Sequence, residues 1–211
     1  ALKEFCCDQA EIDRAVKYSS LASHVHTALH EVVGHASGQI EPGVAEPDVT
    51  LKSYASTLEE GRADLVALYY MMDPKLVELG VIPSLDAGKA EYDAYIRNGL
   101  LVQLRRLKLG DQIEEAHMQN RQWVSSWVYE KGLTDSVIVK TVRDGKTYFH
   151  IRDYEKLRTI FGQLLRDVQR IKSQGDYTAG HDLVENYGII VDQGLLAEVL
   201  LEQRDGLSRE R

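Results

Sequence analysis

The distribution of proline is the feature that most constrains the fold of this chain. All four prolines of the 211 residues lie within the first 83 positions, so residues 84–211 contain none. Proline removes a backbone donor and breaks helices, and its absence permits long helices in this region. A hydrophobic share of 44% and a charged share of 27% are typical of a folded domain. Because chains of this length commonly form one domain, we expect a single, mainly α-helical domain over residues 1–211.

Helical periodicity supports this expectation. Apolar residues recur every three or four positions over residues 157–171 and 95–107, which places them on one face of a helix. A glycine follows soon after each stretch and predicts its end. We expect further helices over residues 12–35 and 111–131, and a loop over residues 38–53, where glycine and proline are frequent.

One segment has the composition of β-structure. Residues 137–142 and 147–151 are rich in valine, isoleucine, threonine and aromatic residues, and Asp144-Gly145 lies between them. Two β-rich runs on either side of an Asp-Gly turn are typical of a hairpin. The sequence therefore predicts one β-hairpin, at about residues 136–151, inserted in the helical domain.

Charge and cysteine content exclude several classes of protein. The formal net charge of −8 argues against a surface that collects nucleic-acid phosphates. No apolar run approaches the roughly 18–20 residues that span a bilayer, so we expect no membrane partner. The two cysteines, Cys6 and Cys7, are adjacent and rarely reach disulfide geometry, which favours a reducing, cytoplasmic location.

Histidines cluster near the amino terminus, where four of the seven lie within residues 24–35. Imidazole is the commonest metal ligand in proteins, and the string His-Glu-Val-Val-Gly-His at residues 30–35 resembles a metal motif. In a regular helix His30 and His35 would lie about 140° apart, too splayed to share an ion. A π-bulge would bring them to one face, and Gly34 could help the backbone adopt it.

Acidic residues complete the candidate metal centre. Glu31 follows His30 directly, which is the position of a general base that activates water. The string Glu-Glu-Gly-Arg-Ala-Asp at residues 59–64 offers further ligands on a second helix. Glu60 and Asp64 are four residues apart and share a helix face, so one can bind the metal while the other holds a histidine ligand.

Other interpretations of these residues remain open. His26 and His30 form a rival pair of ligands that needs no bulge, although Thr27 rather than an acid follows His26. Histidines on helices are also commonly structural or exposed, and acidic clusters are commonly solvated faces.

The combination of HEVVGH at 30–35 and EEGRAD at 59–64 resembles the dipeptidyl peptidase III family, zinc exopeptidases with the motifs H-E-x-x-G-H and E-E-C-R-A-[ED]. Residues 116–121 resemble a later H-x-Q-x-R helix of that family, and residues 172–176 resemble its K-S-x-G-D segment. The similar segments occur in the same order, and they extend over residues 27–187.

The resemblance implies one Zn²⁺ per chain, with His30, His35 and Glu60 as its ligands and Glu59 and Asp64 as partners of the ligand histidines. It also implies that Glu31 activates water, that His117 stabilises the tetrahedral intermediate, and that Arg121 binds the far end of the peptide or orients the site. Without the resemblance, His117 and Arg121 would be interpreted as an exposed polar pair. We expect Arg62 to form a structural ion pair.

Two residues depart from the family pattern, because Gly61 replaces its usual cysteine and Asp64 is one methylene shorter than glutamate. The enzymes of this family are longer and two-lobed, whereas this chain begins at Ala1, about thirty residues before the first motif. We expect it to be the helical zinc-binding lobe of an enzyme that hydrolyses oligopeptides and releases dipeptides from their amino termini.

An upstream, β-containing lobe would be the partner of this chain, and the 211 residues alone would be weakly active or inactive. The alternatives are a non-catalytic helical module that retains a metal site, and an enzyme of other chemistry that carries the motif.

Overall fold

The computed structural model describes residues 2–209 of the chain and the side chains of residues 4–202. The expected domain also includes Ala1, Glu210 and Arg211, which lie outside the described residues. The longer helices are α2 (Gln9–Leu29), α4 (Ala55–Met71), α6 (Leu85–Leu100), α7 (Ala116–Lys131), α8 (Tyr154–Gln174) and α10 (Gln193–Arg209). The shorter helical elements are α1 (Leu2–Phe5), η1 (His30–His35), α3 (Pro47–Thr50), η2 (Lys52–Tyr54), α5 (Pro74–Glu78), η3 (Val102–Arg106), α9 (Tyr177–Val184) and η4 (Glu185–Ile189).

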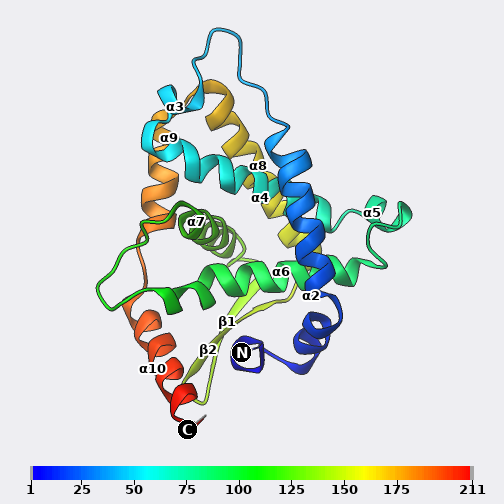
Figure 1. Ribbon diagram of the computed structural model, residues 1–211, viewed down its shortest axis with the longest axis vertical. Helices are drawn as coiled ribbons and strands as arrows, with labels where there is room; N and C mark the ends of the chain where they lie inside the picture. The colour runs from blue at the N-terminus through cyan, green and yellow to red at the C-terminus, as the bar shows by residue number, and fades with distance from the viewer. Residues whose placement is uncertain (1, 210–211) are drawn as a thin grey trace.

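Helix α7 lies at the centre of the fold. Figure 1 shows it end-on, between α4 and α6, and it contacts both of these helices as well as α8 and η4. Its residues Trp123, Val124 and Val128 are fully buried. Helix α2 crosses α6 and packs against it and against α4. This arrangement brings the carboxyl end of α2, the middle of α4 and the first turn of α7 to one side of the domain.

The most amphipathic stretch of the sequence forms α8, as predicted. Leu157, Phe161 and Leu164 are almost fully buried on one face of this helix. Its start is capped by Asp153, which accepts a hydrogen bond from the Lys156 amide, and its end is capped by Gly175 in the left-handed conformation. The predicted helix and the glycine that ends it are therefore confirmed.

The predicted hairpin is also confirmed. Strands β1 (Ile138–Arg143) and β2 (Lys146–Ile151) pair antiparallel, with Ile138 opposite Ile151 and Arg143 opposite Lys146. Asp144 and Gly145 form the two-residue turn, with φ of 51° and 75°. Both angles are positive, as the tight hairpin turn requires.

Several boundaries differ from the sequence predictions, and α6 begins at Leu85, ten residues before the predicted stretch. Helix α7 begins at Ala116 rather than at residue 111, because the Glu115 carboxylate caps it by accepting from the amides of His117 and Met118. Helix α6 ends at Leu100, and the apolar pattern that continues to residue 107 is carried by the 3₁₀ element η3. The expected loop over 38–53 contains the short helix α3, which starts at Pro47 where a missing amide donor costs nothing.

Buried apolar side chains form one cluster that extends from Phe5 on α1 to Val199 on α10. This core joins the helices to the hairpin, which contributes Ile138, Phe149 and Ile151. Among the described residues, no helix combines the length and the apolar character needed to cross a membrane.

A close contact between α4 and α7 explains one departure from the resembled family. A Cβ atom at Gly61 would lie 1.9 Å from Cζ2 of Trp123, so no larger residue fits unless the indole moves. Trp123 is fully buried, and its Nε1 lies 3.3 Å from the Thr57 hydroxyl, to which it donates. The indole occupies the space that a side chain at position 61 would need.

Gly61→Ala should therefore lower the free energy of unfolding. Overpacking a core commonly costs about 1–3 kcal/mol, which exceeds the roughly 1 kcal/mol that alanine gains over glycine in a helix. Denaturant unfolding of Gly61→Ala, Trp123→Leu and the double variant should show a smaller penalty in the double variant.

Gly194→Ala, on α10, is the matched control, because the nearest atom to its added Cβ is the Asp192 carboxylate at 3.3 Å. If Gly61→Ala were as stable as the wild type, the close contact with Trp123 would not limit this position.

Candidate metal centre

The segment His30–His35 forms a π-helix that continues directly from α2. A π-helix bonds residues i and i+5, so side chains five apart lie above one another. The ring centroids of His30 and His35 are 4.6 Å apart, with an angle of 85° between the ring planes. The predicted departure from α geometry is confirmed, and it covers the whole motif rather than one inserted residue.

The small size of Gly34 allows the π-helix to approach α4 closely. The φ of Gly34 is not in the left-handed region, so this backbone conformation does not itself require glycine. A Cβ at Gly34 would instead lie 2.8 Å from Cβ of Ala63 on α4, which is closer than side chains pack. The Gly34 carbonyl also accepts a 2.7 Å hydrogen bond from Arg62. Glycine thus lets the π-helix rest directly on α4.

Helix α4 places Glu60 against both histidines. Its carboxylate lies 3.3 Å from Nε2 of His30 and 4.0 Å from Nε2 of His35. One donor atom from each of these three residues lies within 4.8 Å of the others. Two imidazole nitrogens and a carboxylate are the ligand set of many catalytic zinc sites, which keep a fourth position for water. The donor atoms present therefore fit a zinc ion.

The other ring nitrogen of each histidine faces a carboxylate of α4. Nδ1 of His30 lies 2.7 Å from Asp64, and Nδ1 of His35 lies 3.2 Å from Glu59. Such contacts fix the ring orientation and the tautomer, and leave Nε2 free to bind a metal. The structure thus brings Glu59 and Asp64 to the two histidines that the resemblance paired with them.

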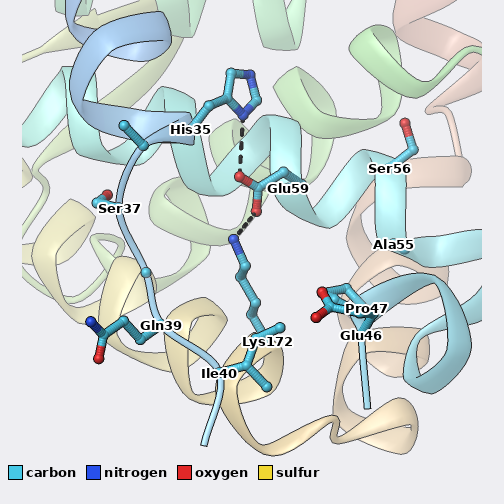
Figure 2. Close-up of a pocket in the computed structure, with 12 residues that line it drawn as sticks. His35, Ser37, Gln39, Ile40, Glu46, Pro47, Ala55, Ser56, Glu59 and Lys172 are labelled. Atoms are coloured by element: carbon cyan, nitrogen blue, oxygen red, sulfur yellow. Dashed lines mark hydrogen bonds and ion pairs between the residues drawn. The ribbon is translucent and has the colours of Figure 1, made fainter. Parts of the chain in front are cut away.

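Glu59 is held as an anion by two cations. Arg62 donates to both of its oxygens, at 2.7 and 3.0 Å, and Lys172 donates at 2.8 Å. Burial would raise the pKa of Glu59, but these bonds outweigh it and lower the pKa to about 2. Figure 2 shows the Glu59 carboxylate between the His35 ring and the Lys172 ammonium. Arg62 forms the structural ion pair that was expected, and only 1% of it is exposed.

Two cavities flank His35. One, of about 620 Å³, is lined by the three candidate ligands together with Glu31, His117 and Arg121. The other, of about 1040 Å³, lies on the side of Glu59 and Lys172 and is bordered by the loop that follows the π-helix (Figure 2). The candidate metal ligands and the candidate polar groups from α2, α4 and α7 therefore converge on the smaller cavity.

Helix α7 contributes His117 from its first turn. Nδ1 of His117 lies 3.6 Å from the Glu60 carboxylate, and its side chain is 58% exposed. Arg121 lies one turn further along and lines the same cavity. The two residues therefore share the cavity of the candidate ligands, rather than an unrelated polar face.

Sequence reasoning missed Tyr95 and Asn120 as partners of Asp64, and it named His26 only as a rival metal ligand. Tyr95 and Asn120 donate to its second oxygen at 2.8 and 2.7 Å, and His26 lies 3.1 Å from the oxygen that His30 also contacts. Burial would raise the pKa of Asp64, but the hydrogen bonds from the two histidines hold it well below its usual range.

Burial would likewise lower the pKa of His26, but its carboxylate neighbours raise it to about 10. His26 and Asn120 lie one helical turn from His30 and His117, which was the available signal. His24, by contrast, is exposed and lies outside both cavities.

Comparisons with known proteins agree with this geometry. The sequence model of Peptidase family M49 matches residues 41–205 of the chain. Dipeptidyl peptidase 3 of Mus musculus and that of Homo sapiens are each 26% identical to it over 222 aligned positions, which cover 88% of this chain and 30% of the relative. The chain thus spans about a third of the length of the curated relatives it matches.

Two solved structures share the fold. Dipeptidyl peptidase III from Caldithrix abyssi superposes with a TM-score of 0.70 at 22% identity, covering 94% of this chain and 35% of the other. Dipeptidyl-peptidase III from Corallococcus sp. strain EGB gives a TM-score of 0.70 at 18% identity, covering 97% and 34%. Because the family model matches more than three quarters of its length, this helical chain with one hairpin belongs to Peptidase family M49.

Proposed function

We propose that this chain is the zinc-binding catalytic lobe of a dipeptidyl peptidase that hydrolyses oligopeptides and releases dipeptides from their amino termini. One observation carries the proposal, which is that His30, His35 and Glu60 converge in a cavity also lined by Glu31 and His117. Membership of a peptidase family and the names of the curated relatives support the reaction type.

One Zn²⁺ would be held by His30, His35 and Glu60. When bound, it would supply a Lewis acid for the scissile carbonyl and lower the pKa of the attacking water to about 7. Asp64 and Glu59 would accept hydrogen bonds from the Nδ1 atoms of His30 and His35, and this would orient both Nε2 atoms toward the metal.

Glu31 would act as the general base. It lies next to His30 on the π-helix, it lines the cavity, and its side chain is exposed to solvent there. Its carboxylate would accept a proton from water as the water oxygen attacks the peptide carbonyl. The same proton would then pass to the amine nitrogen as the C–N bond breaks.

His117 and Arg121 would bind the reacting peptide. A ring nitrogen of His117 can donate to the oxyanion that develops on the scissile carbonyl, since this ring lies beside Glu60 and faces the cavity. Arg121 lines the same cavity one turn away, where its guanidinium can bind a carbonyl or carboxylate further along the peptide.

Residues outside this chain would complete the enzyme. The chain covers 30% of its curated relatives, and we propose that an upstream, β-containing lobe supplies the groups that hold the peptide amino terminus. The domain over residues 1–211 would be one lobe beside that partner. The free thiols of Cys6 and Cys7 support a cytoplasmic location.

The chain should bind one zinc ion, and Glu60→Ala should weaken that binding by more than about 100-fold, because one of three protein ligands is lost. Zinc content after mild dialysis and affinity by chelator competition measure this. Glu114→Ala, an exposed acid on the segment before α7, is the control. An unchanged zinc content in Glu60→Ala would move the site to the second candidate group, His26, His30 and Asp64.

In the intact enzyme, Glu31→Gln should retain zinc and lose turnover by about 10²–10⁴-fold, because the amide keeps the shape of the side chain but cannot accept a proton. Steady-state hydrolysis of a dipeptidyl chromogenic substrate measures the loss, with Glu114→Gln as the matched control. Turnover within threefold of the wild type would mean that another residue activates the water.

The 211 residues alone should release little or no dipeptide even when zinc is fully bound. Positioning of the reactants can contribute about 7–11 kcal/mol to catalysis, and an open cavity weakens the electrostatic effect of His117. Dipeptide release is compared with and without a separately produced upstream lobe. Robust activity of this chain alone would show that its site is complete without a partner lobe.

A further inference from the structure

The Asp64 carboxylate is the most fully hydrogen-bonded group of the site. It is 8% exposed and contacts four side-chain donors, which are His26, His30, Tyr95 and Asn120. A carboxylate has about four lone-pair positions, so these contacts use its whole capacity. These contacts favour a supporting role for Asp64, although His26, His30 and Asp64 also form a second group whose donor atoms could hold a metal ion.

His26 reaches Asp64 from the helix that carries His30. The two histidines are four residues apart, so their side chains lie one turn apart on one face of α2 and η1. Nε2 of His26 lies 3.1 Å from Oδ1 of Asp64, and Nδ1 of His30 lies 2.7 Å from the same oxygen. His26 and His30 thus meet at one carboxylate atom.

The other nitrogen of His26 also faces an acid. Nδ1 of His26 lies 3.0 Å from Oε1 of Glu91 on α6, which is an ion-pair distance without hydrogen-bond geometry, and the His26 side chain is 12% exposed. A histidine that binds a metal must offer a nitrogen lone pair to it. Both ring nitrogens of His26 lie close to carboxylates, which favours a donor role for His26 over a ligand role.

Glu91 and His26 together limit the movement of Asp64. The Asp64 carboxylate keeps its contact with His30 only while its orientation is fixed. His26 contacts the same oxygen atom, Oδ1, that contacts His30. The contact between a ligand histidine and its acid determines ring orientation and tautomer, and its loss typically lowers metal affinity about 10–100-fold. A chain of contacts therefore runs from Glu91 through His26 and Asp64 to the candidate ligand His30.

We propose that His26 is a positioning residue of the metal centre, which is held by Glu91 and acts through Asp64 on His30. This inference rests on the metal site of the proposed function. It makes His26 a supporting residue, in contrast to the rival interpretation of His26 and His30 as a pair of ligands.

The test compares His26→Asn with His26→Gln in the 211-residue chain. The two amides have the same chemistry, but glutamine is one methylene longer and can donate to Asp64 from the position of Nε2, whereas asparagine cannot reach it. Zinc affinity is measured by chelator competition, and stability is measured by thermal unfolding of the zinc-free chain. We expect His26→Asn to weaken zinc binding by about 10–100-fold and His26→Gln to stay within threefold of the wild type.

His24→Ala, an exposed histidine two residues away, is the control and should leave affinity unchanged. Equal, large losses in His26→Asn and His26→Gln would overturn the proposal and indicate a direct ligand. Wild-type affinity in His26→Asn would overturn it as well.

If the proposed metal site were wrong, the zinc-binding measurements would give a different result. In that case the wild-type chain would bind no zinc, or Glu60→Ala would bind zinc as tightly as the wild type. If the wild type binds zinc and Glu60→Ala does not, the His26 variants test this inference alone.

Discussion

The contact between Gly34 and Ala63 determines the geometry of the site. An added Cβ at Gly34 would lie 2.8 Å from Cβ of Ala63, so the π-helix and α4 meet with only the Ala63 methyl group between them. This close approach allows a short acid such as Asp64 to reach the ring of His30. Arg62 reinforces the contact, because it donates to the Gly34 carbonyl and to Glu59 at once. All protein donors of the proposed metal centre lie on these two elements.

The two ligand histidines are held by different means, and burial explains the difference. Asp64 lies in the interior, where an anion is tolerated only if hydrogen bonds satisfy it, and four donors surround it. Glu59 lies at the edge of a cavity, where the charges of Arg62 and Lys172 balance it. His30 is correspondingly less exposed than His35, with side-chain exposures of 12% and 32%.

Sequence patterns predicted the elements whose structure is determined by residues that are close together along the chain. The hairpin follows from Asp144-Gly145 and its β-rich flanks, and the π-helix follows from the requirement that His30 and His35 face one ion. The start of α7 was misplaced by five residues, because the Glu115 carboxylate caps the helix and residues 111–115 precede it as a non-helical segment.

Contacts between distant segments could not be predicted. Glu91 meets His26 only because α6 packs across α2, and no spacing in the sequence encodes that crossing. The same holds for Tyr95, which reaches Asp64 from α6. The sequence motif therefore predicts Asp64 itself, whereas the residues that contact Asp64 are determined by tertiary packing.

The six residues 59–64 of α4 contact several different elements of the fold. Glu59 and Arg62, three apart, share a face and pair with each other, while Glu60 and Asp64, four apart, both face the histidines. Gly61 points the opposite way, where the indole of α7 leaves no room for a side chain. Each position is constrained by a different neighbour, so the motif reflects the packing of α4 between the π-helix and α7 as much as the chemistry of a metal site.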